Sequence, residues 1–347
     1  MATTTTTTTT TNAIYGRFVN NDDNRYSLEK PYIYHGPDLG FPSTNLAFKE
    51  APLNSLTDLR NVPDSQRPTI ETHGFCFIAN ESKELGKVTD ENDSQPYAKE
   101  MAEVLRKLLG ASKVVPVHTA YLRINCPKLR SANQDHMLAR PGTEAHMDTT
   151  MYDAWSRIRA LISPEEQDLV LSGACRARIV NLWRPLHHPA DSHPLAMLDP
   201  NSVSYDTDHM ALDHVTPSMN AETAYLLYNP AHKWYWLSGQ TPNEPWVFTQ
   251  YDTHPPDGKF NHVGHCSFPN PSAPSNAPPR QSIEARFTVL SPAPYTKTVT
   301  LTEPRPVENR RQIWKEVLGK EGKDGGWKPT YKEEDSLAAG EVKDAAA

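Results

Sequence analysis

The sequence lacks long hydrophobic runs, an apolar leader and any close pair of cysteines. Its 347 residues carry a net charge of -7, which does not favour nucleic-acid binding. No stretch is long and apolar enough to span a bilayer, and the polythreonine N-terminus is unlike a signal peptide. Cys76, Cys126, Cys175 and Cys266 are scattered without a C-x-x-C step, which predicts reduced thiols and a cytoplasmic protein.

Proline, in contrast, is abundant, with 31 residues. Because proline interrupts helix interiors and is tolerated in loops and at strand ends, this content argues against a helical bundle. We expect a disordered threonine-rich tail over residues 1–20, a single folded domain over 45–315 and a flexible C-terminal tail over 319–347. The Pro/Ser/Asn-rich stretch 269–279 is expected to be a loop within that domain.

Three helices can be read from the sequence. Apolar residues recur with helical spacing from Met101 to Leu108, and again from Trp155 to Ile162. Ser163-Pro164-Glu165-Glu166 combines an N-cap serine, a proline in the first turn and a capping-box glutamate. This pattern predicts a third helix that runs to Gly173.

Most of the remaining sequence is typical of strands. Residues 177–183 and 246–251 are short runs rich in β-branched or aromatic residues, and apolar residues alternate with polar ones from Ile283 to Val289. Helices first and strands later, around one core, favour a mainly β fold with flanking helices. We predict a double-stranded β-helix, the jelly-roll or cupin-like barrel.

One motif points to chemistry. Of the 14 histidines, only His146 begins an H-x-D step, and none begins H-x-E. In extended chain, residues i and i+2 point the same way, so His146 and Asp148 could reach one metal ion. With a later histidine they would form the two-histidine, one-carboxylate set that binds iron(II) and leaves coordination positions open. An isolated H-x-D step is more often a surface turn, and spacing alone leaves His254, His262 and His265 as alternatives for the third ligand.

A second group lies further along the chain. Arg280 and Ser282 share one face of an expected strand, and a guanidinium with a hydroxyl suits a carboxylate ligand such as that of a 2-oxo acid. Glu284 and Arg286 have the same parity, so either they reach the mouth of the barrel or a β-bulge changes the register.

Several blocks of sequence resemble the fungal AsaB-like hydroxylase/desaturase family, which includes gibberellin desaturases and cephem-methoxylase-related proteins. The resemblance covers roughly Leu53 to Leu290. The blocks are His73-Gly74-Phe75, Leu109-Gly110-Ala111-Ser112, Asn181-Leu182-Trp183-Arg184-Pro185-Leu186, Asn229-Pro230-Ala231-His232-Lys233-Trp234-Tyr235-Trp236, Tyr251-Asp252-Thr253, Gly264-His265-Cys266-Ser267-Phe268 and Pro278-Pro279-Arg280-Gln281-Ser282-Ile283-Glu284.

The resemblance implies an enzyme: a non-haem iron(II), 2-oxoglutarate-dependent dioxygenase with O2 as its other co-substrate. The family's motifs place the iron ligands at His146, Asp148 and His265, and the 2-oxoglutarate clamp at Arg280 and Ser282. The family's proline before the distal histidine is Gly264 here. The implied reaction is hydroxylation, desaturation or oxidative cyclisation of a small molecule in secondary metabolism.

Contacts to the primary substrate are less defined. Asn181, Arg184 and Tyr251 are candidates, although a satisfied core amide and a structural salt bridge are alternative roles for the first two. The 234–236 aromatic run is more typical of core than of a pocket. A 2-oxoglutarate-independent iron oxidase and an inactive cupin-like binding module remain alternative functions, and a homodimer is compatible with the sequence.

Overall fold

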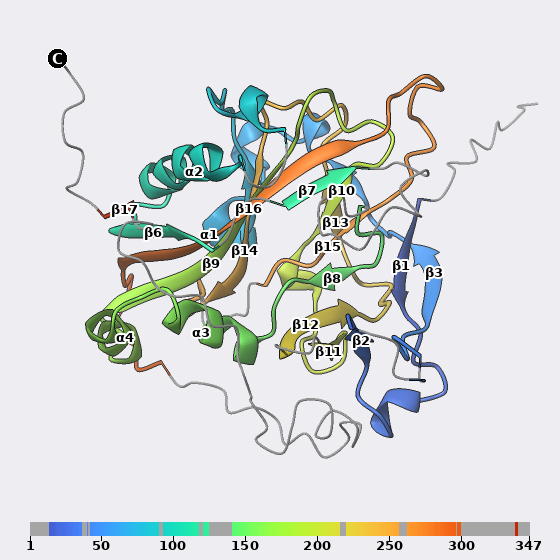
Figure 1. The fold of residues 1–347 in the computed structure, drawn as a ribbon. Helices are drawn as coiled ribbons and strands as arrows, with labels where there is room; N and C mark the ends of the chain where they lie inside the picture. The colour runs from blue at the N-terminus through green and yellow to red at the C-terminus, as the bar shows by residue number, and fades with distance from the viewer. Residues whose placement is uncertain are drawn as a thin grey trace, which may run out of the picture.

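Two facing β-sheets form the body of the protein in a computed structural model (Figure 1). The structure describes residues 14–36, 40, 42–89, 93–117, 121–124, 141–215, 220–256, 262–295, 297–299 and 337–338. This architecture confirms the predicted jelly-roll core. Among the helices in these ranges, none has the length and apolar composition needed to cross a bilayer.

One sheet, here called the major sheet, contains the two longest strands among the described residues. Its order is β17-β6-β16-β9-β14-β5, with β7 paired to β16. The strands are β5 (Phe75–Phe77), β6 (Lys113–Pro116), β7 (Tyr121–Ile124), β9 (Cys175–Pro185), β14 (Trp246–Asp252), β16 (Gln281–Pro292) and β17 (Leu337–Ala338).

Shorter strands form the opposite sheet, the minor sheet. Its order is β2-β11-β12-β8-β15-β10-β13-β4. The strands are β2 (Tyr32–Tyr34), β4 (Thr57–Asp58), β8 (His146–Met147), β10 (Leu195–Leu198), β11 (His209–Val215), β12 (Asn220–Leu226), β13 (Trp234–Trp236) and β15 (His265–Ser267).

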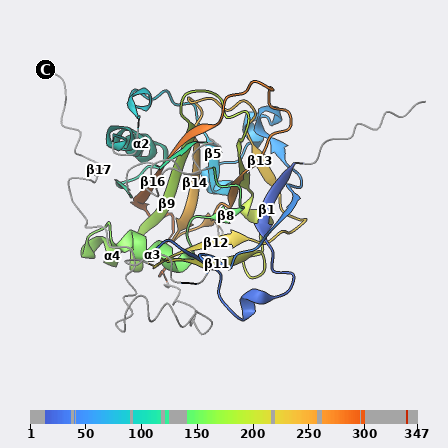
Figure 2. The ribbon, with the colours of Figure 1, turned by 45° about the vertical axis from the view of Figure 1, so that its right-hand side comes forward.

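Smaller elements surround the two sheets. A separate hairpin-like pair of antiparallel strands, β1 (Tyr15–Val19) and β3 (Phe48–Pro52), lies beside the minor sheet in both ribbon views (Figure 2). The α-helices are α1 (Ile70–His73), α2 (Gln95–Leu108), α3 (Met151–Arg159) and α4 (Pro164–Leu171). Short 3-10 helices cover Arg25–Ser27, Leu59–Asn61, Asp64–Gln66, Leu85–Lys87 and Pro200–Ser202.

The pairing of β9 with β16 is the longest in the molecule's described part. It runs without a register shift from Ser282, opposite Pro185, to Pro292, opposite Cys175. Because side chains alternate across a strand, Asn181 and Arg286 lie opposite each other on the inner face. The uninterrupted register also shows that no bulge separates Ser282 from Glu284 and Arg286.

The two faces of the major sheet pack against different partners. On the outer face, α2 contributes Met101 and Leu105 to a buried cluster that includes Leu182 and Phe287. On the inner face, one end is covered by apolar residues of α3 and α4. Elsewhere on that face, Trp183, Phe248 and Met197 belong to a cluster that joins the two sheets. The remaining inner surface carries polar side chains, described below.

The structure corrects two expectations. Residues 15–19 form strand β1 and residues 32–34 form β2, so ordered structure begins well before the expected boundaries at 20 and 45. Strands β1 to β5 also precede α2, so helices do not come first. Short strands with few β-branched residues, paired only over long sequence distances, give no clear period-2 signal. Apart from β17, the expected C-terminal tail lies outside the described residues.

The predicted start of the third helix is confirmed. The Ser163 hydroxyl accepts a hydrogen bond from the backbone N–H of Glu166, and the Glu166 carboxylate accepts one from the N–H of Ser163 at 2.8 Å. This capping box satisfies two helix-end donors that otherwise lack intrahelical partners. The helix begins at Pro164 for this reason.

Substitution Ser163→Ala should remove one of these bonds and lower the free energy of unfolding by about 1 kcal/mol. Chemical denaturation of the two proteins measures the difference. Ser65→Ala, at an exposed position, is the control and should stay within about 0.5 kcal/mol of wild type. Equal stability of Ser163→Ala and the control would contradict a role for the cap.

Candidate metal centre

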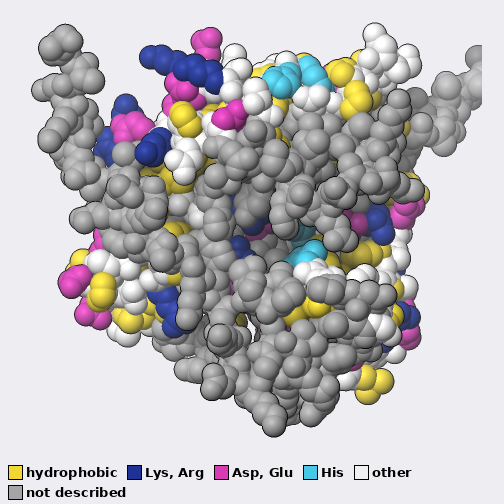
Figure 3. Space-filling model, in the orientation of Figure 1, with side chains coloured by type: hydrophobic (Ala, Val, Ile, Leu, Met, Phe, Trp, Pro, Cys, Tyr) yellow, Lys and Arg dark blue, Asp and Glu magenta, His cyan; other side chains and the backbone are white. Residues whose placement is uncertain are grey.

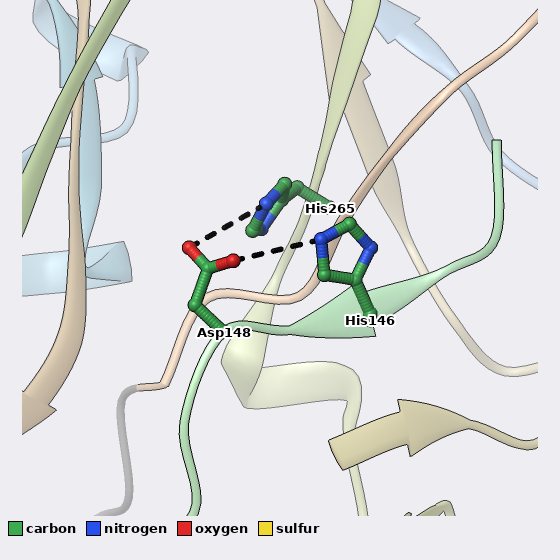
Figure 4. A group of neighbouring side chains, drawn as sticks. All are labelled: His146, Asp148 and His265. Atoms are coloured by element: carbon green, nitrogen blue, oxygen red, sulfur yellow. Dashed lines mark ion pairs between the residues drawn. The ribbon is translucent and has the colours of Figure 1, made fainter. Parts of the chain in front are cut away.

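Two neighbouring strands of the minor sheet bring three distant residues together. β8 and β15 pair with His146 opposite His265, and Asp148 lies just beyond the end of β8. Figure 4 shows the Asp148 carboxylate pointing toward both imidazole rings. Within the described part of the chain, these three form the one group of histidine, cysteine or acidic residues with metal-ligand spacing.

The distances in this group suit one small cation. One ligand atom from each residue lies within 4.8 Å of the others. Nε2 of His146 is 3.6 Å from Oδ1 of Asp148, and Nε2 of His265 is 3.9 Å from Oδ2. The two ring centroids are 4.4 Å apart. Metal–ligand bonds of about 2 Å could therefore connect all three to one ion.

Hydrogen bonds select the tautomer of both histidines. Nδ1 of His146 lies 2.7 Å from the carbonyl of Glu144, and Nδ1 of His265 lies 3.2 Å from the carbonyl of Val263. A carbonyl only accepts, so each Nδ1 must carry the proton and donate. In the neutral ring, each Nε2 then keeps its lone pair, which is the form that binds metals.

The electrostatics of the group also favour an ionised carboxylate. Burial raises the pKa of Asp148, but the charge of Arg286 and the electrostatic effect of the two neighbouring histidines outweigh it, so the pKa lies well below its ordinary value. Burial, with the nearby charge of His146, lowers the pKa of His265 to about 3. The site therefore presents an anion and a neutral imidazole at neutral pH.

A buried glutamine links two of the three residues. Gln250 on β14 accepts a hydrogen bond from the backbone N–H of Asp148 at 2.8 Å through Oε1. Its Nε2 donates to the carbonyl of Val263 at 2.9 Å, the same carbonyl that accepts from His265. Gln250 has no exposed surface. It therefore fixes the Asp148 backbone relative to the His265 ring from the opposite sheet.

Arg280 contacts β15, the strand that carries His265. One of its nitrogens, Nη1, donates to Ser267 Oγ at 2.9 Å and to the carbonyl of His193 at 3.0 Å. Ser267 follows His265 by two residues on β15. The guanidinium also lies over the Trp183 ring, 5.3 Å from its centroid. The side chain of Arg280 is thus oriented by neutral groups.

Arg280 and Ser282 retain unused hydrogen-bonding capacity. Nε of Arg280 and Oγ of Ser282 are buried and have no hydrogen-bond partner among the described residues. Burial, and then the charge of Arg123, lower the pKa of Arg280 to about 9. Arg123 lies opposite Ser282 in the β7–β16 pairing. A buried cation with a spare donor beside a spare hydroxyl is suited to an anionic ligand.

The structure separates the other candidates. Asn181 lies in the centre, where its Nδ2 donates to Asp148 Oδ2 at 2.6 Å. Arg184 lies on the outer face of β9, bonded to Asn80 and packed against Tyr97 of α2. Arg184 was expected as a possible substrate contact, but the sheet separates its side chain from the metal centre. Tyr251 belongs to the apolar cluster beneath α3.

The rival histidines lie outside the three-residue group. His262 is buried with its ring 5.6 Å from that of Tyr251, and His254 bonds the Thr253 hydroxyl at 2.9 Å. Sequence analysis also missed His193, whose backbone carbonyl accepts a hydrogen bond from Arg280. Gln250 was also missed, since an isolated glutamine in a strand has no sequence signature. Trp234 is buried in an apolar cluster, as expected for a core residue.

One side of the metal centre, at His146, is more exposed to solvent than the rest. The His146 side chain is 22% exposed, whereas those of Asp148 and His265 are 8% and 4% exposed. Histidine, basic and acidic side chains are visible together in the middle of the face shown in Figure 3. A ligand approaching from solvent would therefore meet His146 first.

The residues of this site are chemically suited to bind an iron(II) ion together with a 2-oxo acid. Two Nε2 lone pairs and one carboxylate on one side match the facial arrangement of non-haem iron oxygenases. The unsatisfied Nε of Arg280 and Oγ of Ser282 suit the distal carboxylate of such an acid. Fold and site together define the class of jelly-roll, non-haem iron oxygenases.

Comparison with known proteins agrees with this class. Residues 17–290 match the family described as oxidoreductase/YMDC permease-like domain. The alpha-ketoglutarate-dependent dioxygenase tstK of Talaromyces stipitatus is 30% identical over 68% of this chain and 84% of its own length. The hydroxylase/desaturase CTB9 of Cercospora beticola is 29% identical over 64% and 71%, respectively.

Solved structures give the same result. The iron and alpha-ketoglutarate-dependent endoperoxidase NvfI, in a structure described as having a different conformation, superposes with a TM-score of 0.66. The two chains are 26% identical, and the match covers 80% of this chain and 97% of NvfI. The protein therefore belongs to the oxidoreductase/YMDC permease-like family and is an iron(II)/2-oxoglutarate-dependent dioxygenase related to the fungal hydroxylase/desaturases.

Substitution Gln250→Leu should destabilise the protein by about 2 kcal/mol or more, because it strands the buried N–H of Asp148 and weakens the hold on Val263. Denaturant unfolding measures the loss. Gln66→Leu, at an exposed position, is the matched control and should change stability by less than about 0.5 kcal/mol. If Gln250→Leu were as stable as this control, the link between the two sheets would have no energetic weight.

Proposed function

We propose that this enzyme oxidises a C–H bond of a small molecule in fungal secondary metabolism, by hydroxylation, desaturation or oxidative cyclisation. His146, Asp148 and His265 would bind iron(II), while Arg280 and Ser282 would bind the distal carboxylate of 2-oxoglutarate. The observation that carries the assignment is the pair of imidazoles whose Nε2 atoms face one buried carboxylate. The named relatives, all oxidoreductases, support the reaction class.

The bound iron and 2-oxoglutarate supply the activation of dioxygen for attack on an unreactive C–H bond. The protein's own contribution is orientation. The carbonyls of Glu144 and Val263 hold the two imidazoles at Nδ1, so that neither ring can turn its protonated nitrogen toward the metal. The Trp183 face and the Ser267 hydroxyl hold Arg280 in one position.

Burial of the residues that would bind iron(II) and 2-oxoglutarate limits the access of water to them. Asp148, His265, Arg280 and Ser282 are each less than a tenth exposed. In such surroundings, the attraction between Arg280 and a carboxylate is stronger than it would be in water. Binding of 2-oxoglutarate would therefore also complete the hydrogen bonding of Arg280 Nε and Ser282 Oγ.

Two alternatives are less well supported. An iron oxidase that needs no 2-oxoglutarate would have no use for a buried arginine with an unsatisfied donor beside an unsatisfied hydroxyl. A non-catalytic binding module would not need both imidazoles held in the metal-binding tautomer. We further propose a cytoplasmic location, supported by the free thiols of Cys76, Cys175 and Cys266, and a single catalytic domain running from β1 to β16.

Anaerobic addition of iron(II) and 2-oxoglutarate to the purified protein should produce the weak visible charge-transfer band of a chelated 2-oxo acid. His265→Ala should abolish the band because a metal ligand is lost. Arg280→Ala should retain the band but reach it only at a 2-oxoglutarate concentration at least about 10-fold higher. The reason is the loss of a charge-assisted hydrogen bond worth about 1.5–3 kcal/mol.

The control for this titration is Arg60→Ala, which breaks an ion pair with Glu244 on the protein's exterior and should leave the titration unchanged. An iron-loaded wild type without the band would exclude 2-oxoglutarate as the co-substrate. A wild type that bound no iron would favour the non-catalytic module.

His146→Ala and Asp148→Ala should each abolish 2-oxoglutarate consumption, because two remaining ligands hold iron(II) poorly. Succinate formation in the presence and absence of candidate substrates measures this loss. Circular dichroism of each variant checks that the fold is retained. Consumption at the wild-type rate in both variants would show that the metal is bound elsewhere.

A further inference from the structure

Both oxygens of the Asp148 carboxylate are held by donors from the opposite sheet. Nη2 of Arg286 donates to Oδ1 at 2.8 Å, and Nδ2 of Asn181 donates to Oδ2 at 2.6 Å. Arg286 and Asn181 are direct partners in the β16–β9 pairing. The major sheet thus presents a matched pair of donors to a carboxylate that belongs to the minor sheet.

A second carboxylate fixes the arginine of this pair. Nε of Arg286 donates to Glu284 Oε1 at 2.8 Å, and Asn181 Nδ2 lies 3.5 Å from the same oxygen. The side chains of Arg286, Glu284 and Asp148 are 15%, 12% and 8% exposed. Glu284 and Asp148 therefore hold the guanidinium between them, on two different nitrogens.

The arrangement has a mechanical consequence for Asp148. The terminal torsion of a free aspartate is broad, so its carboxylate can adopt many orientations. Here a donor on each oxygen means that rotation about the Cβ–Cγ bond would break both hydrogen bonds together. The backbone of the same residue is held by Gln250. Asp148 is therefore fixed at both its main chain and its carboxylate.

We propose that Arg286, anchored by Glu284, and Asn181 are positioning residues that fix the Asp148 carboxylate in its iron-binding orientation. The proposal rests on the proposed function, because it assigns Asp148 as an iron ligand. It also divides the polar residues along β16 and directly before it into two pairs. Arg280 and Ser282 serve the co-substrate carboxylate, whereas Glu284 and Arg286 serve the metal carboxylate.

Arg184 shows how a purely structural arginine differs. It is buried on the outer face of the same strand pair, and its bonds go to the carbonyls of Asn80 and Pro242 and to the Asn80 side chain. It contacts no acidic group in these bonds. Arg286, in contrast, directs one nitrogen at a metal-ligand carboxylate and another at the carboxylate that restrains it.

The test is anaerobic measurement of iron(II) affinity, together with the position and intensity of the 2-oxoglutarate charge-transfer band. Arg286→Gln should weaken iron(II) binding about 10–100-fold, the range for loss of a group that orients a metal ligand. The band should shift or broaden as the carboxylate gains freedom. Arg286→Lys should recover part of the affinity, because it restores a cation but not the two-sided contact.

Three further variants complete the design. Asn181→Ala should weaken iron(II) binding by removing the bond to Oδ2, and Glu284→Gln should have a smaller effect because its oxygen can still accept from Arg286. Arg106→Gln, which breaks the ion pair with Glu103 on α2, is the matched control with unchanged affinity and band. Thermal unfolding identifies any variant that fails to fold.

Wild-type affinity and an unchanged band in folded Arg286→Gln would overturn the proposal and leave the proposed function intact. If Arg286→Gln does not fold, Asn181→Ala decides by the same criteria. A wild type that binds no iron(II) would instead defeat the proposed function itself. A stability loss in any variant, without a change in affinity or band, would mean a structural role and would also overturn the proposal.

Discussion

The candidate metal centre and the proposed 2-oxoglutarate clamp depend on the continuous antiparallel pairing of β9 with β16. This pairing keeps Ser282, Glu284 and Arg286 on one face without a change of register, and Arg280 directly precedes β16. Because the same strands bury an apolar layer against α2 on their other face, a slip by one residue would exchange the two sets. The hydrophobic cluster beneath α2 thus determines which polar groups enter the barrel.

Much of this centre could be predicted from sequence, because strand periodicity and short motifs are local. Parity predicted that Arg280 and Ser282 share one face, and it raised the question of Glu284 and Arg286. The question remained open because register depends on the partner strand, which sequence periodicity does not reveal. In the structure, Arg286 points inward and donates a hydrogen bond to Asp148, which lies far earlier in the chain.

Contacts between sheets could not be predicted. Gln250 is an unremarkable polar residue in an apolar run, yet it joins Asp148 to Val263 across the barrel. Arg184 lies in a family motif, but its parity is opposite to that of Asn181, and it faces α2. The short strands β1, β2 and β8 have too few residues to show a period. Their positions follow from long-range pairing.

The three-residue strand β15 has a consequence for cooperativity. It carries His265 at one end and Ser267, the hydroxyl that holds Arg280, at the other. A displacement of this strand would alter the proposed metal site and the proposed carboxylate site together. If both proposed sites are occupied, occupancy of one would restrict the freedom of the other, and thermodynamic reciprocity would make the effect equal in both directions. The order in which metal and 2-oxo acid arrive cannot change that coupling free energy.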